Sequence, residues 1–149
     1  MKYQWISNDE QETIALGKKL GELVSANMII TLQGDLGAGK TTFTKGIGQG
    51  LGIKAIINSP TFTILKQYVG RLQLHHFDAY RLEDQDDDLG FEDIFEEGGV
   101  CVIEWAHFIE DILPKERLEI IINKDQNKRH ITLHPIGSIY EALVKELMQ

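Results

Sequence analysis

The chain has 149 residues, of which 42% are apolar and 26% are charged, and its formal net charge is −8. A length of this order suits one globular domain, and we expect a single domain over residues 1–149. The acidic balance argues against tight binding of nucleic acid by this chain alone, because binding to a phosphate backbone requires cations.

No apolar run approaches the ~20 residues that are needed to span a bilayer, and the N-terminus lacks the apolar stretch of a signal peptide. We therefore expect a cytoplasmic protein that does not act at a membrane. The acidic residues are concentrated, since residues 83–97 hold nine carboxylates and no Lys or Arg. This segment is either a solvated acidic surface or a docking face for a basic protein partner.

A helix is predicted near the N-terminus. Ser7 followed by Glu10 has the pattern of a capping box, which opens a helix. The apolar residues beyond it recur at helical spacing and fall on one face: Leu16, Leu20, Leu23 and Val24. Gly17 and Gly21, four positions apart, predict close packing of this helix against a neighbour.

A buried strand, a glycine-rich loop and a second helix are expected next. Residues 28–32 form a short β-prone run that is typical of a buried strand, and residues 34–39 are rich in glycine. Apolar side chains then recur every four positions before a pair of glycines, which predicts a helix and its end: Phe43, Ile47 and Leu51, then Gly50 and Gly52. An irregular loop is expected over residues 53–63.

Two hairpins are predicted in the second half of the chain. The first hairpin has the strands 64–69 and 72–77, which are joined by a turn near Gly70. The second hairpin has the strands 118–122 and 130–133, and we expect its polar turn to cover residues 124–129.

The segments around these hairpins complete the expected order. A short helix is predicted at residues 91–95 and a buried strand at residues 100–105. The single cysteine, Cys101, lies in that strand, which indicates a small buried thiol and excludes an internal disulfide. Ser138 with Glu141 predicts a capping box for a C-terminal helix.

The glycine-rich loop carries the strongest motif. GDLGAGKT, residues 34–41, satisfies G-x-x-x-x-G-K-[ST] in full and lies between a predicted strand and a predicted helix. Its glycines let backbone N–H groups converge on phosphate oxygens, and the helix directs its positive end at the anion. Lys40 adds a mobile positive charge and Thr41 a hydroxyl for Mg²⁺. The motif predicts a site for a nucleoside triphosphate with Mg²⁺.

Two carboxylates end predicted strands, where Mg²⁺ and an attacking water would need them. For Glu104 we favour a Mg²⁺-linked or water-orienting role. For Asp78 the same role, a helix N-cap and a salt bridge to Arg81 remain open. Trp105 is either a core residue or a border of the nucleotide pocket. No histidine site is expected, because neighbours on a strand such as His75 and His76 face opposite ways.

Four blocks of sequence resemble the bacterial TsaE (YjeE) family of ATPases. They are GDLGAGKTT at 34–42, SPTFT at 59–63, HFDAYRL at 76–82 and IEW at 103–105. The resemblance covers about residues 7–133 in the family's order and spacing. It implies an α/β fold, a P-loop NTPase-like three-layer sandwich with a mixed parallel and antiparallel central sheet.

The resemblance also implies a function. In this family ATP hydrolysis supports a complex with the TsaB and TsaD proteins, which transfers threonylcarbamoyl to adenosine 37 of tRNAs reading ANN codons. The chain itself would not perform the transfer and would meet tRNA only through the complex. We therefore expect weak intrinsic ATPase activity that the partner proteins stimulate.

By motif match, the resemblance implies roles for individual residues. The nucleotide phosphates would contact Asp35, Leu36, Gly37, Ala38, Gly39, Lys40, Thr41 and Thr42, with Thr42 at the α-phosphate. Thr41 and Glu104 would serve Mg²⁺, and Asp78 would join Glu104 in hydrolysis. Thr61 matches a switch threonine that is ordered only with a γ-phosphate, and Arg129 would approach the adenine.

Two other classes of function remain open. A small-molecule kinase would use the same loop, although the chain lacks an arginine-rich lid to enclose the transferred phosphate; its arginines are widely separated: Arg71, Arg81, Arg117 and Arg129. A nucleotide-gated adaptor would bind ATP without meaningful catalysis. Guanine specificity is not expected, since residues 123–126 read Asn-Lys-Asp-Gln where Asn-Lys-x-Asp is required.

Overall fold

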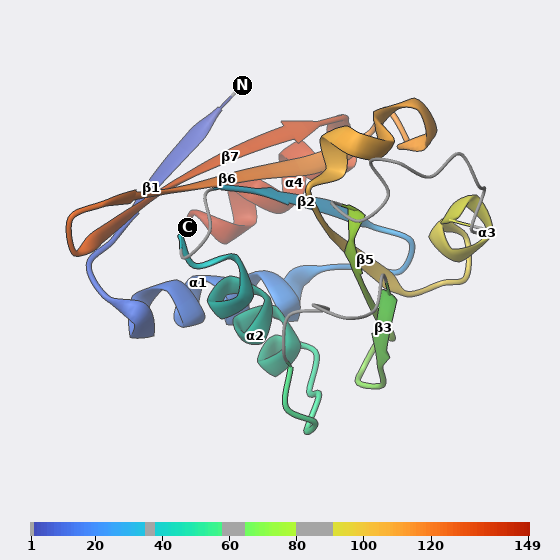
Figure 1. Ribbon diagram of the computed structural model, residues 1–149, viewed down its shortest axis with the longest axis horizontal. Helices are drawn as coiled ribbons and strands as arrows, with labels where there is room; N and C mark the ends of the chain where they lie inside the picture. Colours follow the sequence, from blue (N-terminus) through green and yellow to red (C-terminus); the bar gives the residue numbers. More distant parts are fainter. Residues whose placement is uncertain (1, 35–37, 58–64, 80–90) are drawn as a thin grey trace.

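The computed structural model describes residues 2–34, 38–57, 65–79 and 91–149 (Figure 1). Within them the chain forms a seven-stranded sheet of order β1-β7-β6-β2-β5-β4-β3. The strands are β1 (Tyr3–Ser7), β2 (Ile29–Gln33), β3 (Leu65–Tyr68), β4 (Leu74–Asp78), β5 (Val100–Glu104), β6 (Arg117–Asp125) and β7 (Lys128–Ile136). The helices are α1 (Glu10–Leu23), α2 (Lys40–Gly50), α3 (Phe91–Phe95) and α4 (Ser138–Leu147), with the 3₁₀ helix η2 (Ala106–Ile112).

The sheet is parallel at its centre and antiparallel at its edges. The four central strands β4, β5, β2 and β6 run parallel to one another. β3 pairs antiparallel with β4 at one edge, and β7 and β1 are antiparallel at the other. The four central strands therefore end at one common edge, and the expected mixed sheet is confirmed.

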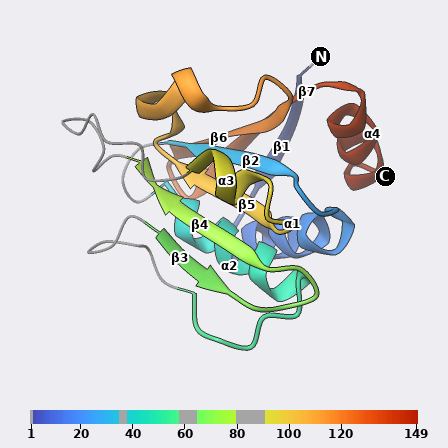
Figure 2. The same ribbon diagram turned by 90° about the vertical axis from the view of Figure 1, so that its right-hand side faces the viewer.

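Helices cover the sheet on both faces. One core cluster joins α1, α2 and α4 to the sheet, and a smaller cluster joins α3 and η2 to the opposite face of β2, β4 and β5. Figure 2 shows α3 in front of the central strands and α2 behind them. The three-layer α/β sandwich follows from this arrangement, with the α3–η2 layer much the smaller.

Glycines set the distance between α1 and α2. A Cβ atom built on Gly17 would lie 2.5 Å from the backbone O of Phe43, and Gly21 also abuts the backbone of α2. Gly46 and Gly50 meet the backbone of α1 in the same way. The close packing predicted from the glycine spacing is confirmed, and it fixes α2 beside α1.

The N-terminal segment differs from its prediction. β1 was not expected, and the capping box of Ser7 and Glu10 is wrong. Ser7 ends β1 and is buried, with its Oγ 2.7 Å from the Oγ1 of Thr13. Asp9 caps α1 instead, since its carboxylate accepts a hydrogen bond of 2.8 Å from the N–H of Glu12.

The C-terminal elements agree in type and differ at their ends. The second hairpin is confirmed, but its strands are longer than predicted and leave only Gln126 and Asn127 as the turn, with Gln126 at φ 57°. Ser138 is not the cap of the last helix. It lies in the first turn of α4, and Gly137 occupies the N-cap position without a side-chain hydrogen bond.

The remaining element predictions are confirmed within the described residues. The first hairpin forms between β3 and β4, and both α3 and β5 lie where they were expected. Cys101 is buried. The irregular loop is described only as far as residue 57. Among the described helices, none combines the length and the apolar character needed to cross a membrane.

Candidate functional site

The glycine-rich loop connects the end of β2 to the start of α2. Gly34 follows β2 directly, and a Cβ there would collide with the backbone O of Ile122. Gly39 is the N-cap of α2 with φ 111°, a left-handed conformation that favours glycine. Ala38 is buried beside it. The three other predicted loop residues lie outside the described residues: Asp35, Leu36 and Gly37.

Lys40 is the first residue of α2 and is held at the loop. Its side chain is buried, and its Nζ donates a hydrogen bond of 2.8 Å to the backbone O of Gly34. The same Nζ lies 4.0 Å from the ring centroid of Trp105, within the range of a cation–π contact. Trp105 is therefore a half-buried residue beside the loop and not part of the closed core.

The first turn of α2 also carries the two threonines of the motif. Thr41 and Thr42 are half-buried, while Thr44 is fully buried and donates from Oγ1 to the backbone O of Lys40. The first turn of an α-helix presents backbone N–H groups that the helix itself does not satisfy. Together with the helix dipole, these groups favour a bound anion at this point.

The two predicted carboxylates lie on adjacent strands. Asp78 and Glu104 are register partners at the carboxyl ends of β4 and β5, and β5 in turn lies beside β2, which leads into the loop. Glu104 is 5% exposed and Asp78 is half-buried. The strand alternation places both side chains on the face that carries Val102, which packs with α1 and α2.

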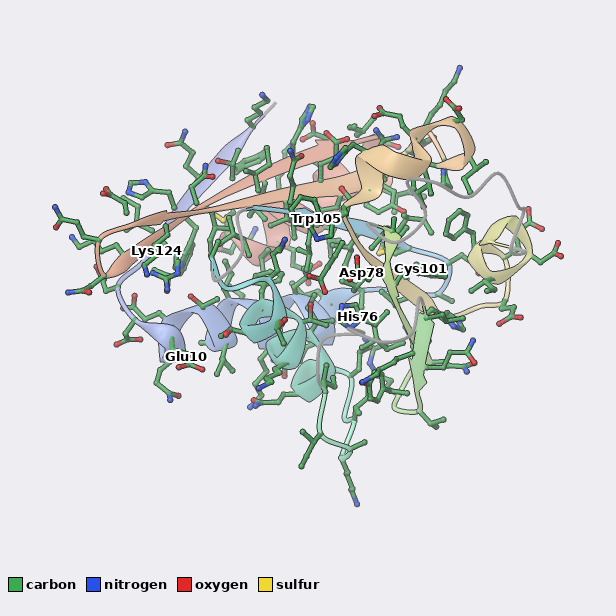
Figure 3. The ribbon with its side chains drawn as sticks, viewed as in Figure 1. Glu10, His76, Asp78, Cys101, Trp105 and Lys124 are labelled. Carbon is green, nitrogen blue, oxygen red and sulfur yellow. The ribbon has the colours of Figure 1, made fainter. Side chains whose placement is uncertain are left out.

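A buried histidine accompanies this pair, and the sequence prediction missed it. His76 lies two residues before Asp78 on β4, so it shares the face of Asp78. Its Nε2 is 2.6 Å from Oε2 of Glu104, and His76 itself is fully buried. Figure 3 shows His76, Asp78 and Trp105 in the middle of the molecule, beside α2.

Among the described residues, no group of three His, Cys, Asp or Glu side chains is placed to hold a metal ion. His75 points to the other face and contacts Gln67. The sequence signal for His76 is its spacing of two from Asp78, which places both side chains on the same face of the strand.

Arg129 lies at the opposite side of the loop, near the start of β7. A Cβ built on Gly39 would lie 3.7 Å from Nε of Arg129, so the guanidinium is next to the N-terminus of α2. It lines a cavity of about 160 Å³ together with residues at the start of α1, at the start of α2 and in the β6–β7 turn: Asp9, Glu10, Thr13, Gly39, Thr42 and Asn127. The cavity offers a place for a polar group beside Thr42.

Two predictions fall outside the described residues. These are the switch role of Thr61 and the salt bridge between Asp78 and Arg81.

Together, a glycine loop between strand and helix, a buried lysine opening that helix and carboxylates at neighbouring strand ends define a P-loop NTPase-like α/β protein. Comparison with known proteins narrows this class. The family model for "Threonylcarbamoyl adenosine biosynthesis protein TsaE" matches residues 7–131. The chain belongs to the TsaE family.

Individual relatives match between about three quarters and nearly all of the chain. The protein named tRNA threonylcarbamoyladenosine biosynthesis protein TsaE from Bacillus subtilis (strain 168) is 49% identical over 146 residues, which cover 97% of this chain and 92% of that protein. The protein of the same name from Treponema pallidum is 44% identical, over 77% of this chain and 87% of its own length. The crystal structure of Bacillus subtilis YdiB superposes with a TM-score of 0.88 at 43% identity, covering 99% of this chain and 95% of that one.

Proposed function

We propose that this chain binds ATP with Mg²⁺ and hydrolyses it as the ATPase component of tRNA threonylcarbamoyladenosine biosynthesis. The relatives named for that pathway support the role, and the loop geometry supports the chemistry. The observation that carries the proposal is the position of Lys40, buried at the start of α2 and held between Gly34 and Trp105.

The phosphate site follows from what surrounds Lys40. In this structure the ammonium group bonds a neutral carbonyl, that of Gly34. A phosphate oxygen is a stronger partner because both groups then carry charge. Lys40 would therefore give up its hydrogen bond to the carbonyl of Gly34 and bind the β- and γ-phosphates instead. Thr42 and the N–H groups of the first helical turn would also bind the phosphates.

The residues present also fit Mg²⁺. Mg²⁺ prefers hard oxygen ligands and keeps several of its waters. Thr41 offers a hydroxyl in the first turn of α2, and Glu104 offers a carboxylate at the end of β5. A bound Mg²⁺ supplies positive charge to the β- and γ-phosphate oxygens.

The carboxylates suit hydrolysis. Asp78 and Glu104 end adjacent parallel strands, so their side chains reach the same edge of the sheet as the phosphate loop. Glu104 would either orient the attacking water or hold Mg²⁺ through the waters bound to the metal. Asp78 would assist from the next strand. The cavity beside Arg129 and Thr42 would take the nucleoside.

Partner proteins complete the proposal. With a net charge of −8, the chain is poorly suited to hold tRNA by itself. We propose that it acts with TsaB and TsaD, which would bring the tRNA and perform the transfer. Hydrolysis by the chain alone would be weak, and the two partners would raise it.

Replacing Lys40 tests the proposal. ATP affinity, measured by titration calorimetry, is expected to fall by at least ~100-fold in Lys40→Ala, or about 2.8 kcal/mol. Multiple-turnover formation of threonylcarbamoyladenosine with TsaB and TsaD should be lost in the same variant. Lys45→Ala, on the same helix, is the matched control and should behave as the wild type. Unchanged ATP affinity in Lys40→Ala, or ATP turnover that TsaB and TsaD leave unaltered, would contradict the proposal.

A further inference from the structure

The side chain of His76 contacts Glu104, yet the proposed ATPase cycle assigns His76 no role. Both groups are buried, with His76 at 0% and the Glu104 side chain at 6% exposure, and their polar atoms are 2.6 Å apart. A carboxylate can only accept, so the hydrogen of this bond belongs to Nε2 of the imidazole. Such charge-assisted hydrogen bonds are short and strong.

The bond fixes one oxygen of the carboxylate. His76 uses Oε2 of Glu104, whereas Oε1 has no hydrogen-bond partner among the described residues. Glu104 is the last residue of β5, and a glutamate has three side-chain torsions to choose from. Without a partner at Oε2, the carboxylate could turn about its terminal torsions, and Oε1 would lose its fixed direction.

His76 is itself well held. It lies within β4, between β5 and β3, and pairs in register with Val102 on one side and Lys66 on the other. Its Nδ1 is buried and makes no hydrogen bond within the part of the chain that the structure describes. The only polar contact of the imidazole there is thus directed at Glu104, which an apolar core residue would not provide.

We infer that His76 is a positioning residue for the ATPase site: it holds the Glu104 carboxylate so that Oε1 faces the water or the metal. This inference rests on the proposed function. It assigns His76 an effect on the chemical step through Glu104 and no contact with ATP. Groups that orient a ligand or catalytic side chain in this way are worth about 10- to 100-fold in activity.

A pair of polar variants separates orientation from packing. The amide N–H of a glutamine reaches about as far as Nε2 of histidine, whereas that of an asparagine is too short to reach Glu104. We expect kcat for ATP to fall about 10- to 100-fold in His76→Asn and to recover to within about fivefold of the wild type in His76→Gln. KM and ATP affinity should change little in both, since the lost interaction lies in the chemical step.

His75 provides the matched control. It is the next residue, equally buried, but it faces the other side of the sheet and contacts Gln67. His75→Asn is expected to lower the melting temperature without lowering kcat at a temperature where the protein is folded. Equal kcat in His76→Asn and His76→Gln, or an equal loss in His75→Asn, would overturn the inference.

A crystal structure of His76→Asn gives a readout that does not depend on activity. The inference expects the Glu104 carboxylate in a changed or multiple orientation, and an unchanged carboxylate would refute it. Failure of the ATPase proposal would look different, since the wild type itself would then not hydrolyse ATP.

Discussion

The two faces of β4 and β5 differ in chemistry, because side chains alternate between the faces along each strand. The face toward α2 carries His76, Asp78 and Glu104, and it ends in charge at the strand ends. The face toward α3 carries Phe77 and Cys101 with their neighbours in a closed apolar cluster. A shift of one residue along a strand therefore separates a candidate site from plain core.

The two adjacent histidines make the contrast sharpest. Both are fully buried. His76 meets a buried carboxylate at 2.6 Å, whereas His75 shares a 2.9 Å hydrogen bond with the side chain of Gln67 and stays 3.8 Å from the exposed carboxylate of Glu97. Burial alone does not mark a functional histidine. The partner, and the direction of that partner toward the phosphate loop, distinguish the two.

The face toward α3 should be unreactive, and the thiol of Cys101 allows this to be measured. Burial, with a smaller effect from Glu97, raises the pKa of the Cys101 thiol to about 12 from 9.0. Because the thiolate is the reactive form, alkylation at pH 8 should be roughly 1000-fold slower in the folded protein than in the unfolded chain. Iodoacetamide labelling followed by mass spectrometry measures both rates on this single cysteine. Labelling of the folded protein within tenfold of the unfolded rate would show that this face opens readily.

On the face toward α2, ATP hydrolysis should instead depend on the negative charge of Glu104. Glu104→Gln keeps the shape of the side chain and can still accept the hydrogen bond of His76, so the fold should be retained. Loss of the carboxylate is expected to lower kcat for ATP by about 10²–10³-fold, while ATP affinity stays within a few-fold of the wild type. Single-turnover hydrolysis and titration calorimetry measure the two quantities separately.

Glu119→Gln is the matched control for this change. Glu119 is also a strand carboxylate, but it lies on β6 and pairs with Arg117 and His134 away from the phosphate loop. Its replacement should leave hydrolysis unchanged. Full hydrolysis in Glu104→Gln would remove Glu104 from the mechanism. Absence of hydrolysis in the wild type, with ATP still bound, would favour the adaptor instead.

The sequence was sufficient where one local pattern determines the structure. The phosphate-loop motif with its flanking strand and helix placed Gly39 and Lys40, because backbone conformation and helix polarity act over a few residues. The strand ends Asp78 and Glu104 could be predicted from apolar runs that stop at a carboxylate. The choice of cap for α1 could not, since Ser7 is drawn into β1 by its pairing with β7, a distant segment.

The interaction between His76 and Glu104 was beyond the sequence for a similar reason. The two residues are 28 positions apart, and their contact depends on β4 and β5 being neighbours in a particular register. Periodicity gives the face of each residue but not the partner strand. The same limit applies to Trp105, whose ring reaches Lys40 because the chain turns at φ 59° directly after β5.

The smallest expected effect concerns His75 and the pH dependence of stability. Burial lowers the pKa of His75 below its ordinary value of 6.5, and the nearby Glu97 opposes this only in part. Above pH 6.5 the imidazole is neutral in both the folded and the unfolded chain, so it adds no penalty. As the pH falls below 6.5, the unfolded chain takes up the proton first, and stability is lost.

Comparison of two proteins isolates this contribution. Urea unfolding at pH 7.5 and pH 5.5 gives the loss of unfolding free energy for the wild type and for His75→Gln. The wild type should lose more, by at most about 1.4 kcal/mol, because the unfolded-state pKa limits the proton uptake over this interval. Other titrating groups contribute equally to both proteins and cancel. An equal loss in both would mean that His75 is protonated in the folded protein as easily as in the unfolded chain. The face toward α3 would then not exclude charge, and the contrast with the face toward α2 would fail.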